Sequence, residues 1–223
     1  MTLTKKAEAT RQHILDTGQQ LVLRKGFVGV GLLEILKACG VPKGSFYHYF
    51  PSKEAFGCAL LQQYVAQYGQ RLNALLAADG SSGRERLMRY WQAWLTEAGE
   101  DGWAEDCLVV KLAAEVADLS EDMRQVLDAG VAALVARLAA LIREGRADGS
   151  LPAGAEPLAL AQVLYQMWLG AALLAKLGRD KTPLHQALAA TGALLACHPT
   201  PSPSLPIQQQ GAPHAQCPAP HLW

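Results

Sequence analysis

The sequence predicts an all-α protein with an N-terminal three-helix domain, containing a helix-turn-helix, and a C-terminal helical bundle. Apolar residues recur at helical spacing along most of the chain, and no segment shows the alternation typical of a strand. Half of the 223 residues are hydrophobic, which is enough for a sizeable core. Gly, Pro and Ser stand where helices would begin or end. We expect residues 1–51 to form the first domain, 52–197 the bundle and 198–223 a disordered tail.

The first domain is expected to contain one longer and two short helices. Apolar residues recur at helical spacing between Ile14 and Leu23, and Gly26 follows as a C-cap. Short helices are expected over about 32–38, ended by Gly40, and over 43–49. Apolar side chains of the short helices should pack on the first helix: Leu33, Leu36, Val41, Phe46 and Phe50 against Ile14, Leu21 and Val22.

Helix-start residues divide the rest of the chain. Ser52 and Ser120 are good N-caps, while Pro157 and Pro183 suit the first turn of a helix. The expected helices cover about 52–79, 104–117, 120–148, 157–178 and 183–197. Residues 158–175 carry no charge and approach the length of a membrane span, but Gln162 and Gln166 favour a helix buried at a subunit interface.

The two ends of the chain differ in composition. Residues 1–56 have eight Lys and Arg against four Asp and Glu, so they carry +4 while the remainder carries −4. This asymmetry favours an N-terminal domain that faces a polyanion. Seven of the twelve prolines lie in 199–220, and no charged residue follows Lys181. Such a tail cannot bury enough surface to fold by itself.

The cysteines and the N-terminus indicate the compartment. Five Cys are odd in number and too sparse for a disulfide framework. The first residues carry charge with no apolar run after them, so they do not form a signal peptide. We therefore expect a cytoplasmic protein, without a membrane partner, whose thiols serve packing or chemistry.

The second short helix offers side chains suited to a DNA groove. Packing of its apolar side leaves five residues outward: Lys43, Gly44, Ser45, Tyr47 and His48. They supply a cation, two slim positions, a hydroxyl and two flat polar rings, and Lys53 stands where it could meet a phosphate. By spacing alone, an ordinary aromatic-rich helical corner remains an alternative.

The segment GVPKGSFYHYFPSKEAF resembles the signature of TetR-family regulators over nearly twenty positions. The resemblance implies a homodimer that binds a palindromic double-stranded operator with its N-terminal domains and senses a ligand with its C-terminal domain. It implies that Lys43, Gly44 and Tyr47 lie against bases, and that Ser45, His48 and Lys53 lie nearer the backbone. Gly31 stands where the family usually has Thr or Ser, so a helix cap and a phosphate contact are expected to be lost.

The C-terminal segments 106–124 and 161–180 resemble the electrophile- and oxidant-responsive repressors of this family. Together with the N-terminal motif, the resemblance covers about residues 9–197 and implies a sensor at Cys107 with Lys176 beside it. The start of a helix and Lys111 one turn on should lower the pKa of Cys107. Glu105 and Asp106 beside it should raise that pKa. Taken without the resemblance, the residues favour the alternative that Cys107 is a small buried packing residue and Lys176 a surface end-cap.

Three aromatic residues are candidates for an effector pocket: Trp94, Tyr165 and Trp168. They support the alternative of a TetR-family repressor released by a non-covalent apolar effector in the C-terminal cavity. We expect no enzyme and no cofactor, because no nucleophile–base set and no metal-ligand spacing are apparent. A dimer is expected through helices 121–146 and 157–178, whose small residues would allow close approach: Ala129, Gly130, Ala133, Gly170 and Ala171.

Overall fold

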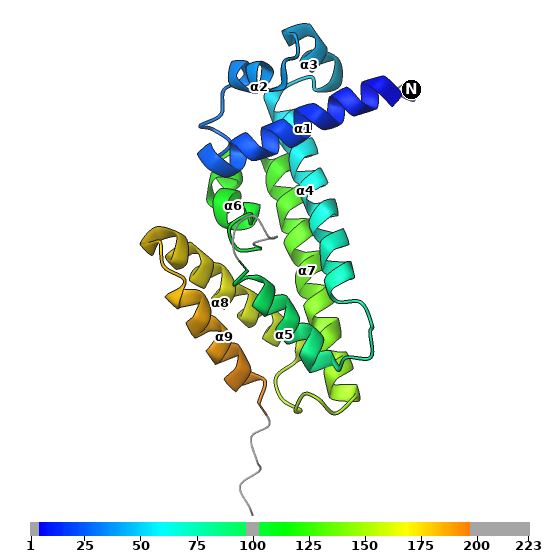
Figure 1. Ribbon diagram of the computed structural model, residues 1–223, viewed down its shortest axis with the longest axis vertical. Helices are drawn as coiled ribbons and strands as arrows, with labels where there is room; N and C mark the ends of the chain where they lie inside the picture. Colours follow the sequence, from blue (N-terminus) through cyan, green and yellow to red (C-terminus); the bar gives the residue numbers. More distant parts are fainter. Residues whose placement is uncertain (1–4, 97–102, 197–223) are drawn as a thin grey trace, which may run out of the picture.

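The computed structural model describes residues 5–96 and 103–196, and within them every regular element is a helix. The elements are α1 (Lys5–Lys25), α2 (Leu32–Cys39), α3 (Lys43–Tyr49), α4 (Lys53–Leu75), α5 (Gly83–Ala93), α6 (Leu108–Leu119), α7 (Glu121–Ala147), α8 (Pro157–Gly178) and α9 (Thr182–Leu194). Figure 1 shows α1–α3 at one end of an elongated molecule and α5, α8 and α9 towards the other, with α4 and α7 running between them. The all-α prediction is confirmed.

Local capping explains most of the helix bounds. The Ser52 hydroxyl accepts a hydrogen bond from the Ala55 N–H at 2.9 Å, and Ser120 does the same for Met123 at 3.3 Å. Gly40 ends α2 in the left-handed conformation, with φ of 67°. Helix α4 ends at Leu75, earlier than predicted, and α6 begins at 108 rather than 104.

The sequence analysis missed α5, although its start carries a strong signal. Ser82 and Glu85 form a capping box, in which each side chain bonds the other residue's backbone N–H. The box satisfies two helix-start donors and fixes where α5 begins. The pattern Ser-Gly-Arg-Glu before Leu87 could have revealed it.

Two apolar cores lie along the molecule. One unites α1–α3 and the first half of α4 with α6 and the start of α7, and includes Leu108, Leu112 and Val116 of α6. The other fills the bundle of α5, α7, α8 and α9 and the end of α4. The first core therefore continues across the predicted domain boundary at residues 51 and 52, and α6 is part of it.

Leu33, which was expected in the core, lies on the surface. Leu36 is buried, as are Phe46 and Phe50, but Leu33 is 75% exposed. Helix α2 has only eight residues, and Ile35 and Leu36 occupy its buried side. Leu33 comes two positions before Ile35, which places it on nearly the opposite side of the helix. Leu21 and Val41, also expected inside, are half-buried.

Helices α7 and α8 are both long and apolar enough to cross a membrane by length and composition alone. Here α7 packs against α4, α5, α6 and α8, which makes it a core helix of the bundle. A Cβ on Gly130 would lie 2.6 Å from Val65 Cγ2, so this glycine serves contact with α4. Ala129 and Ala133 of α7 are exposed, and the dimer face expected on α7 and α8 stays a prediction. Large exposed apolar side chains lie on α8 and α9: Leu158, Val163, Leu173, Leu174, Leu177 and Leu194.

Candidate DNA-binding surface and sensor site

Helix α3 presents the predicted groove-facing residues to solvent. Phe46 is fully buried, with its ring centroid 5.3 Å from that of Phe50 and 5.5 Å from that of Phe56. These contacts fix α3 by one side, because aromatic pairs at this separation are favourable. The opposite side exposes four of the predicted residues, with Ser45 half-buried: Lys43, Gly44, Tyr47 and His48.

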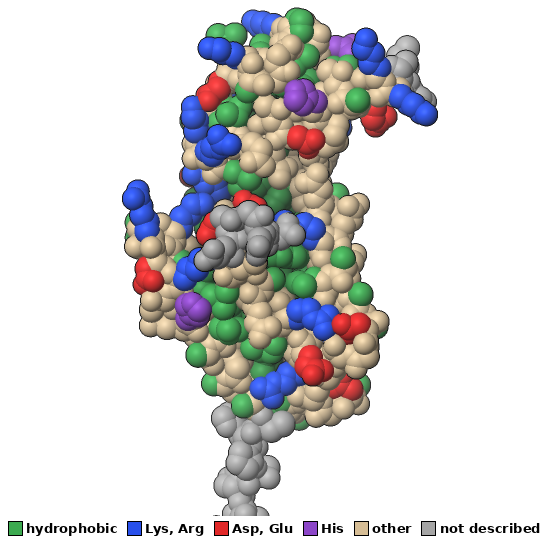
Figure 2. Space-filling model, in the orientation of Figure 1, with side chains coloured by type: hydrophobic (Ala, Val, Ile, Leu, Met, Phe, Trp, Pro, Cys, Tyr) green, Lys and Arg blue, Asp and Glu red, His purple; other side chains and the backbone are tan. Residues whose placement is uncertain are grey.

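The exposed side of α3 is open and cationic. No atom lies within 4 Å of where a Cβ on Gly44 would be, so another molecule can approach the backbone there. The Lys43 ammonium lies 5.9 Å from the centre of the Tyr47 ring, and Tyr47 is 45% exposed. Figure 2 shows Lys and Arg side chains around this end of the molecule. A flat ring beside a cation is suited to base edges next to phosphate.

Lys53 differs from its expected role. Its Nζ donates to the Phe27 carbonyl oxygen at 2.9 Å and lies 4.7 Å from the centre of the Phe27 ring. Burial lowers the pKa of Lys53, and the charge of Glu115 opposes that change. Lys53 therefore holds the loop between α1 and α2, and this geometry does not support the expected phosphate contact.

Gly31 is the N-cap of α2, as expected, and no side chain caps this helix. Its φ of −78° and ψ of 148° are extended values that any residue adopts. No atom lies within 4 Å of the position that a Cβ would occupy. The missing cap is therefore a property of this sequence that the fold does not require.

Cys107 is the N-cap of α6 and is 2% exposed. Burial raises the pKa of its thiol, because the charged form loses solvation. Backbone N–H groups of Val110 and Val109 act in the other direction, as do the Tyr64 hydroxyl and the charge of Lys176. The Tyr64 oxygen accepts from the Leu108 N–H at 3.2 Å, which leaves its own proton for the sulfur.

The charged residues expected around Cys107 are arranged differently. Lys176 lies exposed in the last turn of α8, near enough for its charge to lower the pKa of Cys107. Lys111 points instead to the DNA-binding domain, where its Nζ donates to the Arg24 carbonyl oxygen at 3.3 Å. Glu105 and Asp106 are exposed, where solvent screens their charge. Burial, and not these carboxylates, is the main influence on the thiol.

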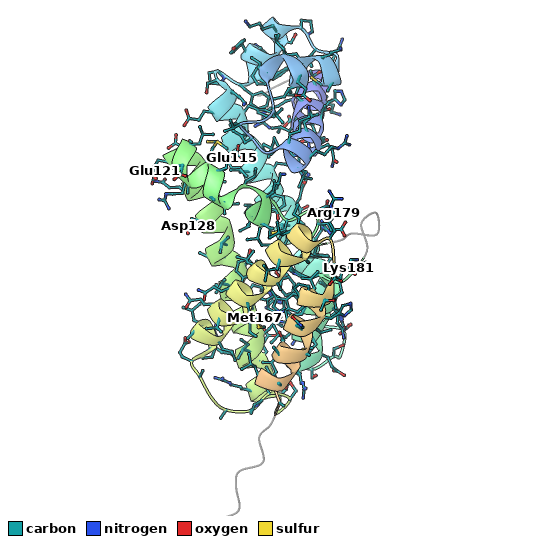
Figure 3. The ribbon with its side chains drawn as sticks, turned by 90° about the vertical axis from the view of Figure 1, so that its left-hand side faces the viewer. Glu115, Glu121, Asp128, Met167, Arg179 and Lys181 are labelled. Carbon is teal, nitrogen blue, oxygen red and sulfur yellow. The ribbon has the colours of Figure 1, made fainter. Side chains whose placement is uncertain are left out.

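The predicted pocket residues do not share one cavity. Tyr165 lines a cavity of about 300 Å³ between α4 and α7, together with Tyr64, Tyr68 and Arg137. Trp94 lines a second cleft of about 580 Å³ between α1 and the end of α8, beside Lys176. Figure 3 shows Arg179 and Lys181 at this end of α8, and both also line the cleft.

Trp168 belongs to the bundle core. It is fully buried and stacks on Trp91, with ring centroids 5.0 Å apart. Its Nε1 donates to the Thr191 hydroxyl at 2.9 Å. A ring with both its face and its polar atom occupied is a structural residue. Trp168 lines neither of the two cavities described above.

The other cysteines are weaker candidates for the sensor than Cys107. Cys39 and Cys58 are half-buried, and burial raises the pKa of each. Asp122 and Glu54 raise that of Cys58 further. Cys197 and Cys217 lie outside the described residues. In the described part of the chain, no group of three His, Cys, Asp or Glu could hold a metal.

Two family models match this chain. Residues 14–56 match "Bacterial regulatory proteins, tetR family", and residues 83–191 match "Tetracyclin repressor-like, C-terminal domain". The HTH-type transcriptional repressor NemR of Escherichia coli K12 is 49% identical over 187 residues, which cover 84% of this chain and 94% of NemR. The chain belongs to the TetR family.

Solved structures of the family agree with this assignment. The reduced form of E. coli NemR is similar with a TM-score of 0.79 at 49% identity, covering 87% of this chain and 99% of that one. A putative TetR/AcrR-family regulator is similar with a TM-score of 0.77 at 58% identity, covering 85% and 100%. As a TetR-family member the chain is a DNA-binding transcriptional repressor, and its relatives are regulators and not enzymes.

Proposed function

We propose that this chain is a cytoplasmic homodimeric repressor, released from a palindromic operator when an electrophile or oxidant modifies Cys107. The observation that carries the proposal is the place of Cys107. It caps α6, and α6 packs in the same apolar core as the DNA-binding helices. A change at this sulfur therefore acts on an element that touches the DNA-binding domain directly.

The chemistry at Cys107 follows from its surroundings. A maleimide accepts the thiolate at its double bond, so that a carbon–sulfur bond forms and the neighbouring carbon takes a proton. A two-electron oxidant such as hypochlorite converts the thiolate to a sulfenic acid. Either product adds atoms to the side chain of a residue that is 2% exposed. A close-packed interior has no room for them, so α6 has to shift as a body.

The surroundings of Cys107 favour its thiol form in one respect and its thiolate form in another. Burial keeps most of the thiol protonated, which protects it from weak reagents. Lys176 and the Tyr64 hydroxyl stabilise the thiolate when it forms. Lys176 also provides an amine that can pair with the modified sulfur. We infer that this balance restricts the response to strongly reactive compounds.

The exposed faces of α8 and α9 support a dimer. They hold several large apolar side chains that are half-exposed or more, such as Leu173, Leu174 and Leu177 at the end of α8. Covering these side chains with a second copy removes apolar surface from water. A two-fold dimer would place two α3 helices in successive major grooves, about 34–36 Å apart. The operator should then be a palindrome.

A cavity in the C-terminal bundle supports the second candidate function, release by a non-covalent effector. The cavity between α4 and α7 has apolar walls and contains Tyr64, Tyr165 and Arg137. An apolar effector with one polar group would fit such a site without any reaction at sulfur. Because Tyr64 lines this cavity and also bonds the start of α6, such an effector could move the same helix.

Operator release by N-ethylmaleimide separates the two candidates. We expect Cys107→Ser to bind the operator like the parent chain and to remain bound when treated. Lys176→Ala should bind normally but change the dose needed for release, and Cys58→Ser is the matched control that should behave like the parent. If Cys107→Ser releases DNA at the parent's dose, the thiol switch is wrong and the non-covalent effector replaces it.

A further inference from the structure

The loop that joins α1 to α2 is bonded to α6 through its backbone. The N–H groups of Phe27 and Val28 both donate to the Glu115 carboxylate, that of Phe27 at 3.1 Å to Oε2 and that of Val28 to Oε1. One turn earlier on α6, the Lys111 ammonium donates to the Arg24 carbonyl oxygen at 3.3 Å. Figure 3 shows Glu115 at the junction between α6 and the N-terminal helices.

The Glu115 carboxylate lies close to the backbone of Gly26. Gly26 has a φ of 77°, and a Cβ at that position would lie 2.8 Å from Glu115 Oε2. A side chain here would be strained by its backbone conformation and would also displace the carboxylate. From α4, Lys53 holds the other side of the same loop through the Phe27 carbonyl oxygen, at 2.9 Å. The polar groups at the start of the loop are thus bonded to two helices.

Apolar contacts also join α6 to the DNA-binding domain. Leu108, Leu112 and Val116 lie in one core with α1–α4. Apolar contacts have no preferred direction, so they hold the helices together without fixing the position of individual polar groups. A carboxylate that accepts from two successive N–H groups fixes both distance and orientation, and charge-assisted hydrogen bonds are the stronger ones. Glu115 is therefore the contact that sets the register between α6 and the loop.

We propose that Glu115 is a positioning residue that makes α6 and the DNA-binding domain move together. The inference rests on the proposed operator binding, but not on the thiol chemistry. Glu115 lies two turns along α6 from the Cys107 cap. A displacement at the start of α6 thus reaches the loop before α2 through Glu115, beside the bond from Lys111 to the end of α1. Without Glu115, α6 can move while the recognition helices keep their places.

The test uses Glu115→Gln with Asp118→Asn as its control. Gln keeps the length of the side chain but turns one of the two acceptors into a donor that faces an N–H. Asp118 is exposed on the same helix, so its change to Asn removes one negative charge without touching the loop. Glu115→Asp is a further variant, which keeps the charge but is too short to bond both N–H groups.

The first measurement needs no inducer. Coupling between two sites is reciprocal, so operator binding should stabilise α6 if α6 controls operator binding. We expect operator DNA to slow amide hydrogen exchange across residues 108–119 in the parent dimer and in Asp118→Asn, and to leave it unchanged in Glu115→Gln and Glu115→Asp. Equal slowing in all four proteins would overturn the proposal, as would no slowing in the parent.

The second measurement is operator release by N-ethylmaleimide. We expect both Glu115 variants to bind the untreated operator within about threefold of the parent. Treatment should weaken operator binding by the parent about tenfold or more, which is a usual size for coupling. Operator binding by the two Glu115 variants should weaken much less. Release of Glu115→Gln equal to that of the parent would overturn the inference. A parent that is not released refutes the thiol switch alone, and the exchange experiment then decides the role of Glu115.

Discussion

Replacing Tyr64 by Phe removes one oxygen that serves two partners at the start of α6. The oxygen accepts from the Leu108 N–H at 3.2 Å, and the hydroxyl also bonds Cys107, where it lowers the thiol pKa. Both partners are buried, so the substitution leaves the Leu108 N–H and the Cys107 sulfur without this hydroxyl in a buried place. The substitution should therefore lower the stability of the protein and the reactivity of the thiol together.

The sizes of the two effects can be worked out from these contacts. An unpaired buried N–H costs about 1–3 kcal/mol, which corresponds to about 2–4 °C in Tm for each kcal/mol in a protein of this length. A hydrogen bond to a charged group contributes about 1.5–3 kcal/mol, so losing the bond to the thiolate should slow alkylation at neutral pH about tenfold or more. Because only the thiolate reacts, a raised pKa displaces the whole rate profile to higher pH.

The assay follows N-ethylmaleimide alkylation by mass spectrometry across neutral and alkaline pH, in a variant that keeps Cys107 as its only cysteine. Tyr68→Phe is the matched control, because its hydroxyl lies 2.9 Å from that of Tyr90 and its loss should destabilise the core without displacing the profile. Loosening of the protein would expose the thiol and speed its reaction, so slower alkylation has only the electrostatic explanation. A Tyr64→Phe profile that coincides with the parent's, or reacts faster, refutes the reasoning.

Three further predictions concern the DNA-binding domain. Tyr47→Ala should weaken operator binding by about 1–3 kcal/mol and leave random DNA nearly unaffected, as competition titrations would show; equal loss on both would remove Tyr47 from base readout. Lys53→Ala should lower Tm and leave the salt dependence of operator binding unchanged, because the Lys53 ammonium bonds the Phe27 carbonyl oxygen. If the slope of log K against log salt concentration fell by about one per half-site, Lys53 would be shown to contact a phosphate. Gly31→Ser should stabilise the domain by a few tenths of a kcal/mol in urea unfolding, since the N-cap position is open.

Most of the fold and the outer face of α3 could be predicted from the sequence, because their causes are local. The caps at Ser52 and Ser120 and the break at Gly40 act within one helical turn, and they give the helix starts and stops that the structure has. The spacing of Phe46 and Phe50 also fixes which side of α3 is buried. Exposure of Lys43, Gly44, Tyr47 and His48 follows from that spacing alone.

Roles that depend on distant partners cannot be predicted from such local patterns. Lys53 and Lys111 look like free cations in the sequence, yet each bonds a carbonyl oxygen 26 or 87 positions away. Trp168 resembles a pocket residue until Thr191 is seen to accept its N–H.

The sequence by itself determined the helices other than α5, the residues presented by α3 and the position of a cysteine at the start of a helix, since hydrophobic spacing and capping are short-range. Only the tertiary structure decided that Cys107 is buried against Tyr64 and that Glu115 holds the loop after α1. Burial and hydrogen bonding between segments 44 and 88 residues apart depend on how helices pack, and packing is set by the whole core.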